Sequence, residues 1–80
     1  MENSLTYIVI DNNPAAQECI VTHLQDMSWL SCEGTFFLLA DALCYMKKHP
    51  VDIAFLELDL PDIDGLDILL LKKKNCKLLS

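Results

Sequence analysis

The sequence predicts an α/β fold built on a doubly wound parallel sheet, with about three βα units and the start of a fourth strand. The first reason is that short, mostly apolar runs typical of strands buried on both faces recur along the chain. The second is that these runs alternate with segments whose apolar residues recur at helical spacing. One small domain over residues 1–80 is expected, incomplete at its C-terminus because the chain stops as the fourth strand begins.

The first βα unit begins with residues 5–10, which are nearly all apolar and include β-branched and aromatic side chains. Asn13 is a suitable N-cap, and Pro14 is a favoured first residue of a helix. Apolar residues then follow at helical spacing: Ala16, Ile20, Leu24 and Met27. The polar residues of this helix are expected on the surface: Gln17, Glu18, Gln25 and Asp26.

The second unit combines a strand over residues 29–36 with a helix over residues 38–48. Gly34 marks a bulge or the end of the strand. Two lysines fall in the last turn of the helix and Pro50 follows it, as is typical of a helix C-terminus.

A third strand is predicted over residues 51–58, a third helix after Gly65, and the start of a fourth strand over residues 76–79. Strands that alternate with helices imply βαβ units with right-handed crossovers. The last edge of such a sheet would be bare, so self-association through an exposed sheet edge, giving a dimer or larger assembly, is expected.

Composition excludes several classes of protein. The net charge is −6 and the isoelectric point is near 4.5, so nucleic-acid binding by this segment is not expected, because phosphate backbones repel an acidic chain. No stretch approaches the roughly 20 apolar residues that span a bilayer, and no signal peptide is recognisable, so a cytoplasmic protein without membrane contact is expected. The cysteines have neither zinc-binding nor CxxC spacing, and free buried thiols in a reducing compartment are predicted: Cys19, Cys32, Cys44 and Cys76.

The candidate site lies where strands end. In open α/β sheets, ligands bind at the carboxyl ends of strands where the strand order reverses. If the first strand is central, Asp11 and Asn12 at its end meet Glu57 and Asp59 at the end of the third strand. These oxygen-bearing side chains predict an acidic pocket suited to Mg²⁺, which prefers oxygen ligands and keeps several waters.

Two motifs resemble those of response-regulator receiver domains. Residues 7–14 (YIVIDNNP) resemble the first strand and acidic turn of the family, and residues 55–65 (FLELDLPDIDG) resemble its phosphorylation loop. Residues 34–36 and 42–52 look like the segment between these motifs in regulators with a LytTR-type DNA-binding output domain. The resemblance covers residues 5–79 and implies a truncated flavodoxin-like, CheY-like receiver fold.

The family's phosphorylation pocket is only partly retained in this sequence. Counting four residues back from Pro61 gives Glu57, at the position where the family has its phosphate-accepting aspartate. Asn12 replaces the second acid of the first motif, while Asp11 is retained. The family's switch hydroxyl has a counterpart only in Ser80, and its essential lysine would lie beyond that residue. The loop residues of the motif are retained: Pro61, Asp64 and Gly65.

These departures act against phosphotransfer. Glutamate adds one methylene, about 1.5 Å, where a 1 Å error can cost about 100-fold in rate. The resemblance therefore implies a degenerate, non-enzymatic module of a two-component system that binds a histidine kinase or another signalling protein, with Glu57 imitating a phosphoaspartate. The alternative hypothesis is a functional, Mg²⁺-dependent phosphorelay receiver that uses Glu57 or Asp59 as the acceptor.

Overall fold

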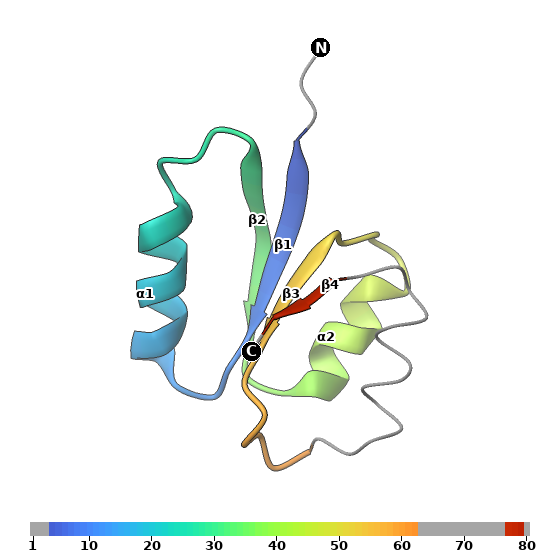
Figure 1. Cartoon of the computed structure of the whole chain (residues 1–80). Coiled ribbons are helices and arrows are strands. Elements are labelled where there is room, and N and C mark those ends of the chain that lie inside the picture. The colour runs from blue at the N-terminus through green and yellow to red at the C-terminus, as the bar shows by residue number, and fades with distance from the viewer. Residues whose placement is uncertain (1–3, 63–76, 80) are drawn as a thin grey trace.

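The computed structural model describes residues 4–62 and 77–79, which form a four-stranded parallel sheet with a helix on each face (Figure 1). The elements in chain order are β1 (Leu5–Ile10), α1 (Pro14–Leu24), β2 (Leu30–Phe36), α2 (Leu39–Met46), β3 (Ile53–Leu56) and β4 (Lys77–Leu79). The strand order is β2-β1-β3-β4, so β1 is central between β2 and β3. The predicted doubly wound α/β fold is confirmed.

β1 is the centre of the sheet and is buried on both faces. Tyr7, Ile8, Val9 and Ile10 are each no more than 2% exposed. Since successive side chains of a strand point to opposite faces, Ile8 and Ile10 face α2 while Tyr7 and Val9 face α1. The apolar run of β1 therefore supplies both layers of the core.

β2 is an edge strand with a bulge. Its register against β1 shifts between Tyr7, which pairs with Cys32, and Ile8, which pairs with Gly34, so Glu33 is the extra residue. The bulge predicted from Gly34 is thus present. The Glu33 carboxylate accepts a hydrogen bond of 2.5 Å from the Tyr45 hydroxyl on α2.

α1 begins as predicted and ends sooner. The Asn13 side-chain oxygen accepts a hydrogen bond of 2.9 Å from the Ala15 amide, with Pro14 in the first turn. The helix ends at Leu24, so Met27 lies outside it and is 39% exposed. The prediction that Gln17 lies on the surface is wrong, because Gln17 is only 7% exposed.

The closed part of the core lies between α2 and the sheet. Its buried residues come from β1, α2, β3 and the segments that flank β3: Ile8, Ile10, Leu39, Ala42, Met46, Val51, Ala54, Leu56 and Leu60. α2 is shorter than the predicted 38–48, and Lys47 is its C-cap. β3 is shorter than the predicted 51–58, since it ends at Leu56.

Some predictions are corrected by the structure and others lie outside the described residues. Cys19, Cys32 and Cys44 are free thiols but are exposed, so the prediction of buried thiols is wrong for these three. Cys76 and the helix predicted after Gly65 lie outside the described residues. No helix among residues 4–62 and 77–79 is long and apolar enough to cross a bilayer.

Candidate functional site

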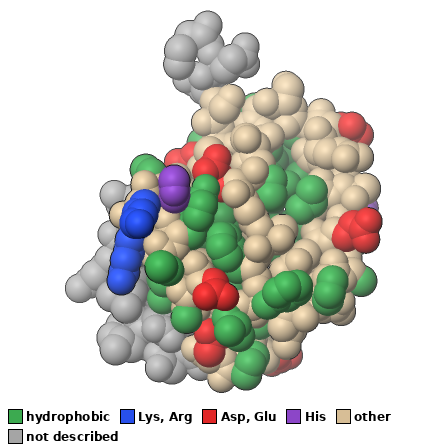
Figure 2. Space-filling view, turned by 180° about the vertical axis from the view of Figure 1, so that it is seen from behind, with side chains coloured by type: hydrophobic (Ala, Val, Ile, Leu, Met, Phe, Trp, Pro, Cys, Tyr) green, Lys and Arg blue, Asp and Glu red, His purple; other side chains and the backbone are tan. Residues whose placement is uncertain are grey.

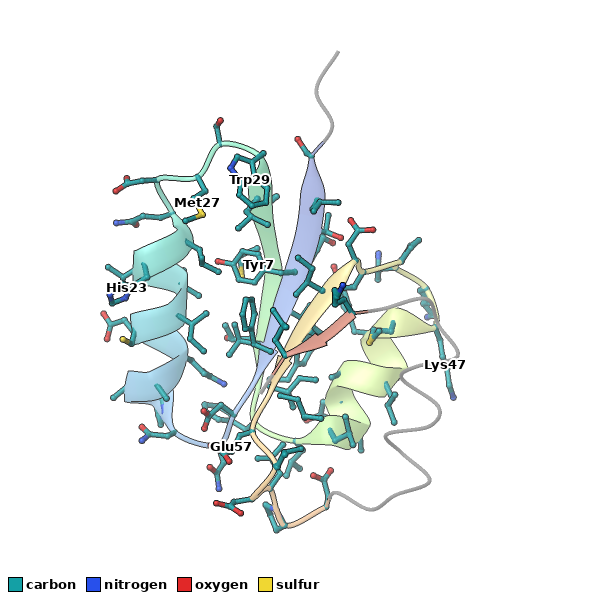
Figure 3. The ribbon with its side chains drawn as sticks, viewed as in Figure 1. Tyr7, His23, Met27, Trp29, Lys47 and Glu57 are labelled. Atoms are coloured by element: carbon teal, nitrogen blue, oxygen red, sulfur yellow. The ribbon has the colours of Figure 1, made fainter. Side chains whose placement is uncertain are left out.

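Asp11 and Glu57 lie side by side at the carboxyl end of the sheet. Ile10 pairs with Leu56 in the register of β1 and β3, and the Glu57 amide donates a hydrogen bond of 2.9 Å to the Ile10 carbonyl. Both acids therefore follow directly after paired residues on neighbouring strands. Figure 3 shows Glu57 at this end of the sheet, far from Trp29 and Met27 at the other end.

The two carboxylates border one cavity of about 250 Å³. The other residues that line it are apolar and come from the sheet and α1: Val9, Ile20, Phe55, Leu56 and Leu79. The cavity thus combines an acidic rim with an apolar interior, and its acids are the first and third of the four predicted site residues.

Gln17 of α1 holds the backbone of Asp11 in place, a role that the sequence does not predict. The Gln17 side-chain amide donates hydrogen bonds to the carbonyls of Asp11 (2.7 Å) and Phe36 (3.0 Å). One oxygen of the Asp11 carboxylate accepts a bond of 2.9 Å from the Asn13 amide. Gln17 therefore ties the start of α1 to the ends of both β1 and β2. A signal was available, because Gln17 lies three residues before Ile20 on the same helical face.

The loop after β3 folds back onto Glu57. The Asp59 amide donates a hydrogen bond of 3.1 Å to one oxygen of the Glu57 carboxylate, and Glu57 is half-buried. The side chain of Asp59 is exposed and does not line the cavity, and the same holds for Asn12. The loop is anchored further along by Leu60, which is 5% exposed.

Asp62 joins this loop to the start of α2. Its two carboxylate oxygens accept hydrogen bonds from the amides of Leu39 (3.2 Å) and Ala40 (3.1 Å). Leu38, the N-cap residue, has no side chain that could accept these bonds. Asp62 therefore performs the capping role from 22 or 23 positions away along the chain.

The donor set for a metal ion is smaller than the four predicted residues. Among residues 4–62 and 77–79, no group of three or more His, Cys, Asp or Glu side chains could hold a metal ion. Mg²⁺ is commonly held by one or two carboxylates with several waters, and Asp11 and Glu57 are enough for such a site. The predicted loop residue Pro61 is exposed, while Asp64, Gly65 and Ser80 lie outside the described residues.

No protein-family model matches this chain, and neither does any curated protein. Its structure is similar to that of the RcsB response regulator of Salmonella typhimurium, a protein studied for its conformational dynamism in DNA interaction. The TM-score is 0.84 at 20% sequence identity. The fold is CheY-like. The match covers 95% of this chain and 41% of the solved one, so the chain corresponds to less than half of that regulator.

In the CheY-like fold the switch point between the outward-running halves of the sheet lies between β1 and β3, where ligands bind. Asp11 and Glu57 stand at that point. The predicted location of the site is therefore consistent with the strand order, although Asn12 and Asp59 do not line its cavity.

Proposed function

We propose that the chain is a degenerate receiver-like signalling module of a two-component response regulator, of the type that carries a LytTR output domain. It acts in the cytoplasm through protein–protein contacts and not as an enzyme. The observation that carries the proposal is the contact between the Glu57 carboxylate and the amide of Asp59.

This contact supports a role for Glu57 as an imitation of a phosphoaspartate. The Glu57 carboxylate accepts this hydrogen bond from the amide two residues further on, as the Asp11 carboxylate does from the Asn13 amide. A hydrogen bond to a charged group is worth about 1.5–3 kcal/mol, and less where water screens it, as at this exposed contact. A fixed negative charge therefore orders the loop without a phosphoryl group.

We expect the two acids that border the cavity to bind Mg²⁺ only weakly. Asn12 is neutral and exposed, and the exposed Asp59 side chain lies outside the cavity, so two carboxylates remain for a cation. Phosphotransfer needs the metal to balance charge on the phosphoryl oxygens, and a site with two carboxylates supplies less of that balance.

The partner is a histidine kinase or another signalling protein, and a second copy of the chain is a further partner through a sheet edge. β4 is the last strand of the described sheet, and no described strand pairs with its outer edge. The opposite edge, β2, is protected by its bulge and by the charge of Glu33, which are features that prevent edge pairing. Self-association is therefore expected through β4.

A second function is a working phosphoacceptor that uses Glu57 or Asp59 with Mg²⁺. The position of Glu57 beside Asp11 at the switch point favours it. Asp59 is the weaker acceptor, because its side chain is exposed and does not line the cavity, while its amide bonds to Glu57.

Labelling with ³²P-acetyl phosphate in the presence of Mg²⁺ separates the two functions. We expect no incorporation above that of the Glu57→Gln variant. Incorporation that is abolished by Glu57→Gln or by Asp59→Asn would instead establish the phosphoacceptor and would refute the degenerate receiver.

A further inference from the structure

A hollow of about 410 Å³ lies between α1 and β2, and it is named here the α1–β2 hollow. The residues that line it belong to these two elements alone: Pro14, Gln17, Glu18, Val21, Thr22 and Thr35. β2 forms the edge of the sheet opposite β4. None of the walls therefore comes from β3, from β4 or from any later residue.

Gln17 presents an unpaired oxygen to this hollow. Its side-chain nitrogen donates to the carbonyls of Asp11 (2.7 Å) and Phe36 (3.0 Å), which uses both of its hydrogens. Its Oε1 has no hydrogen-bond donor among the described residues. Within that same part of the chain every buried side-chain oxygen has a partner, so Oε1 is open to solvent. Because Gln17 is only 7% exposed and lines the hollow, the hollow is where Oε1 is accessible.

The other polar groups of the lining are also able to accept hydrogen bonds. The side chains of Glu18, Thr22 and Thr35 make no hydrogen bond or ion pair within residues 4–62 and 77–79. Glu18 is the one charged residue of the lining, and Pro14 and Val21 supply its apolar wall. This combination suits a positively charged group that donates several hydrogen bonds and carries a short apolar stem.

The lysines that the structure describes lie away from the hollow. Lys47 and Lys48 come at the end of α2, which covers the opposite face of the sheet, and Lys77 is in β4 at the opposite edge. Seen from behind, Figure 2 shows lysine side chains gathered at one side of the molecule beside a histidine. The cation that fits the hollow is therefore not one of these side chains.

We infer that the α1–β2 hollow is a binding site for an alkylammonium group. The three N–H donors of the ammonium bond to Gln17 Oε1 and to the Thr35 hydroxyl, and its charge pairs with the Glu18 carboxylate. The methylene stem lies against Val21. The inference goes beyond the proposed function, because neither carboxylate of the acidic cavity lines this hollow.

The test is an NMR titration of the ¹⁵N-labelled full chain with n-butylammonium chloride at constant ionic strength. We expect saturable shifts at the side-chain amide of Gln17 and at the backbone amide of Thr35. Tetramethylammonium carries the same charge without an N–H donor and should bind at least about 5-fold more weakly. Equal binding of the two cations, or no saturable shift at these residues, would overturn the inference.

A charge substitution separates the hollow from the general negative charge of the chain. Glu18→Gln keeps the shape of the side chain and should weaken n-butylammonium binding about 3-fold. The matched control is Asp26→Asn, which removes an equal charge from an exposed residue that does not line the hollow. Equal weakening in both variants would show only general attraction of a cation to an acidic chain and would refute the site.

A hydroxyl substitution tests the wall that β2 supplies. Thr35→Val replaces the hydroxyl with a methyl group and should weaken binding about 3-fold. Ser31→Ala removes an exposed hydroxyl of the same strand outside the hollow and should leave binding unchanged. Both residues are exposed, so both variants should unfold as the wild type does. Wild-type binding in Thr35→Val would contradict the proposed contact.

Two sources of the ammonium group give distinct results in the same titration. Tighter binding of the peptide acetyl-Gly-Lys-Gly-amide than of n-butylammonium would assign the site to a lysine side chain of a protein. Equal or weaker binding of the peptide would assign it to a free amine, and both results uphold the site. Failure of the site leaves the proposed function intact, since that function fails on phosphate incorporation at Glu57 or Asp59.

Discussion

The two faces of the sheet differ in how completely the described residues cover them. On the α2 face, Leu39, Ala42 and Met46 are buried against Ile8, Ile10 and Ala54. On the α1 face, the buried residues Tyr7 and Val9 come from the sheet, while the apolar side chains of α1 stay half-buried. The comparison indicates that α2 closes a core against the sheet, whereas α1 covers its own face less completely within the described residues.

The largest expected effect comes from truncating matched residues on the two faces. Leu39→Ala on the α2 face should lower the free energy of unfolding by about 2–5 kcal/mol, because it leaves a cavity in a closed core. Ile20→Ala on the α1 face should cost about 1 kcal/mol, since Ile20 is already partly in water. Urea denaturation followed by circular dichroism measures both. Equal losses would mean that the two faces are equally well packed.

On the α1 face, we expect the polar residue Gln17 to contribute clearly to the stability of the fold. Gln17→Ala removes the donor that joins the Asp11 and Phe36 carbonyls and should destabilise the fold by about 1–3 kcal/mol. The neighbouring Glu18→Ala is the control, because Glu18 is exposed and should change stability by less than about 0.5 kcal/mol. If both variants lost the same free energy of unfolding in urea denaturation, the Gln17 hydrogen bonds between the ends of β1 and β2 would not stabilise the fold.

The Asp62 cap should affect α2 more weakly. Asp62→Ala removes the acceptor for the Leu39 and Ala40 amides and should cost about 0.5–2 kcal/mol. Hydrogen exchange should speed up at these two amides in particular. Asp59→Ala, an exposed acid of the same loop, is expected to leave their exchange unchanged. Faster exchange in both variants would indicate general loosening of the loop.

The smallest effect concerns pH and the α1 face. Burial raises the pKa of Tyr7 above its usual value of 10.0, with a further contribution from the neighbouring Cys32. Because the folded pKa is raised, the stability that neutral Tyr7 contributes is present below pH 10 and is lost as pH rises through the folded pKa. Tyr7→Phe should therefore lose less stability than the wild type between pH 9 and about 11. Parallel losses in thermal unfolding would contradict burial of the hydroxyl.

The sequence predicts a strand or a helix end correctly where residues that are adjacent in the chain determine it. The apolar run of β1 and the Asn13-Pro14 cap of α1 are properties of neighbouring residues, and both are found in the structure. The placement of Asp11 and Glu57 at one edge of the sheet follows once the first strand is taken as central, because parallel strands end at the same edge.

Features that depend on side-chain direction or on distant partners were not predictable in this way. Asn12 follows Asp11 directly, but it lies in the bend between β1 and α1 and is exposed, so it does not share the cavity with Asp11. The cap by Asp62 joins residues far apart in the chain, and no local pattern reports it. A polar residue such as Gln17 is expected on the surface, but Gln17 shares a face of α1 with Ile20 and is buried.

The central claim, that Glu57 orders its loop without a phosphate, is tested most directly by the exchange rate of the Asp59 amide in NMR spectra. We expect this amide to be protected in the wild type and in Asp59→Asn, which keeps the backbone donor. Glu57→Gln should lose much of that protection, because a neutral amide oxygen is a weaker acceptor than a carboxylate. Equal protection in Glu57→Gln and the wild type would contradict the claim.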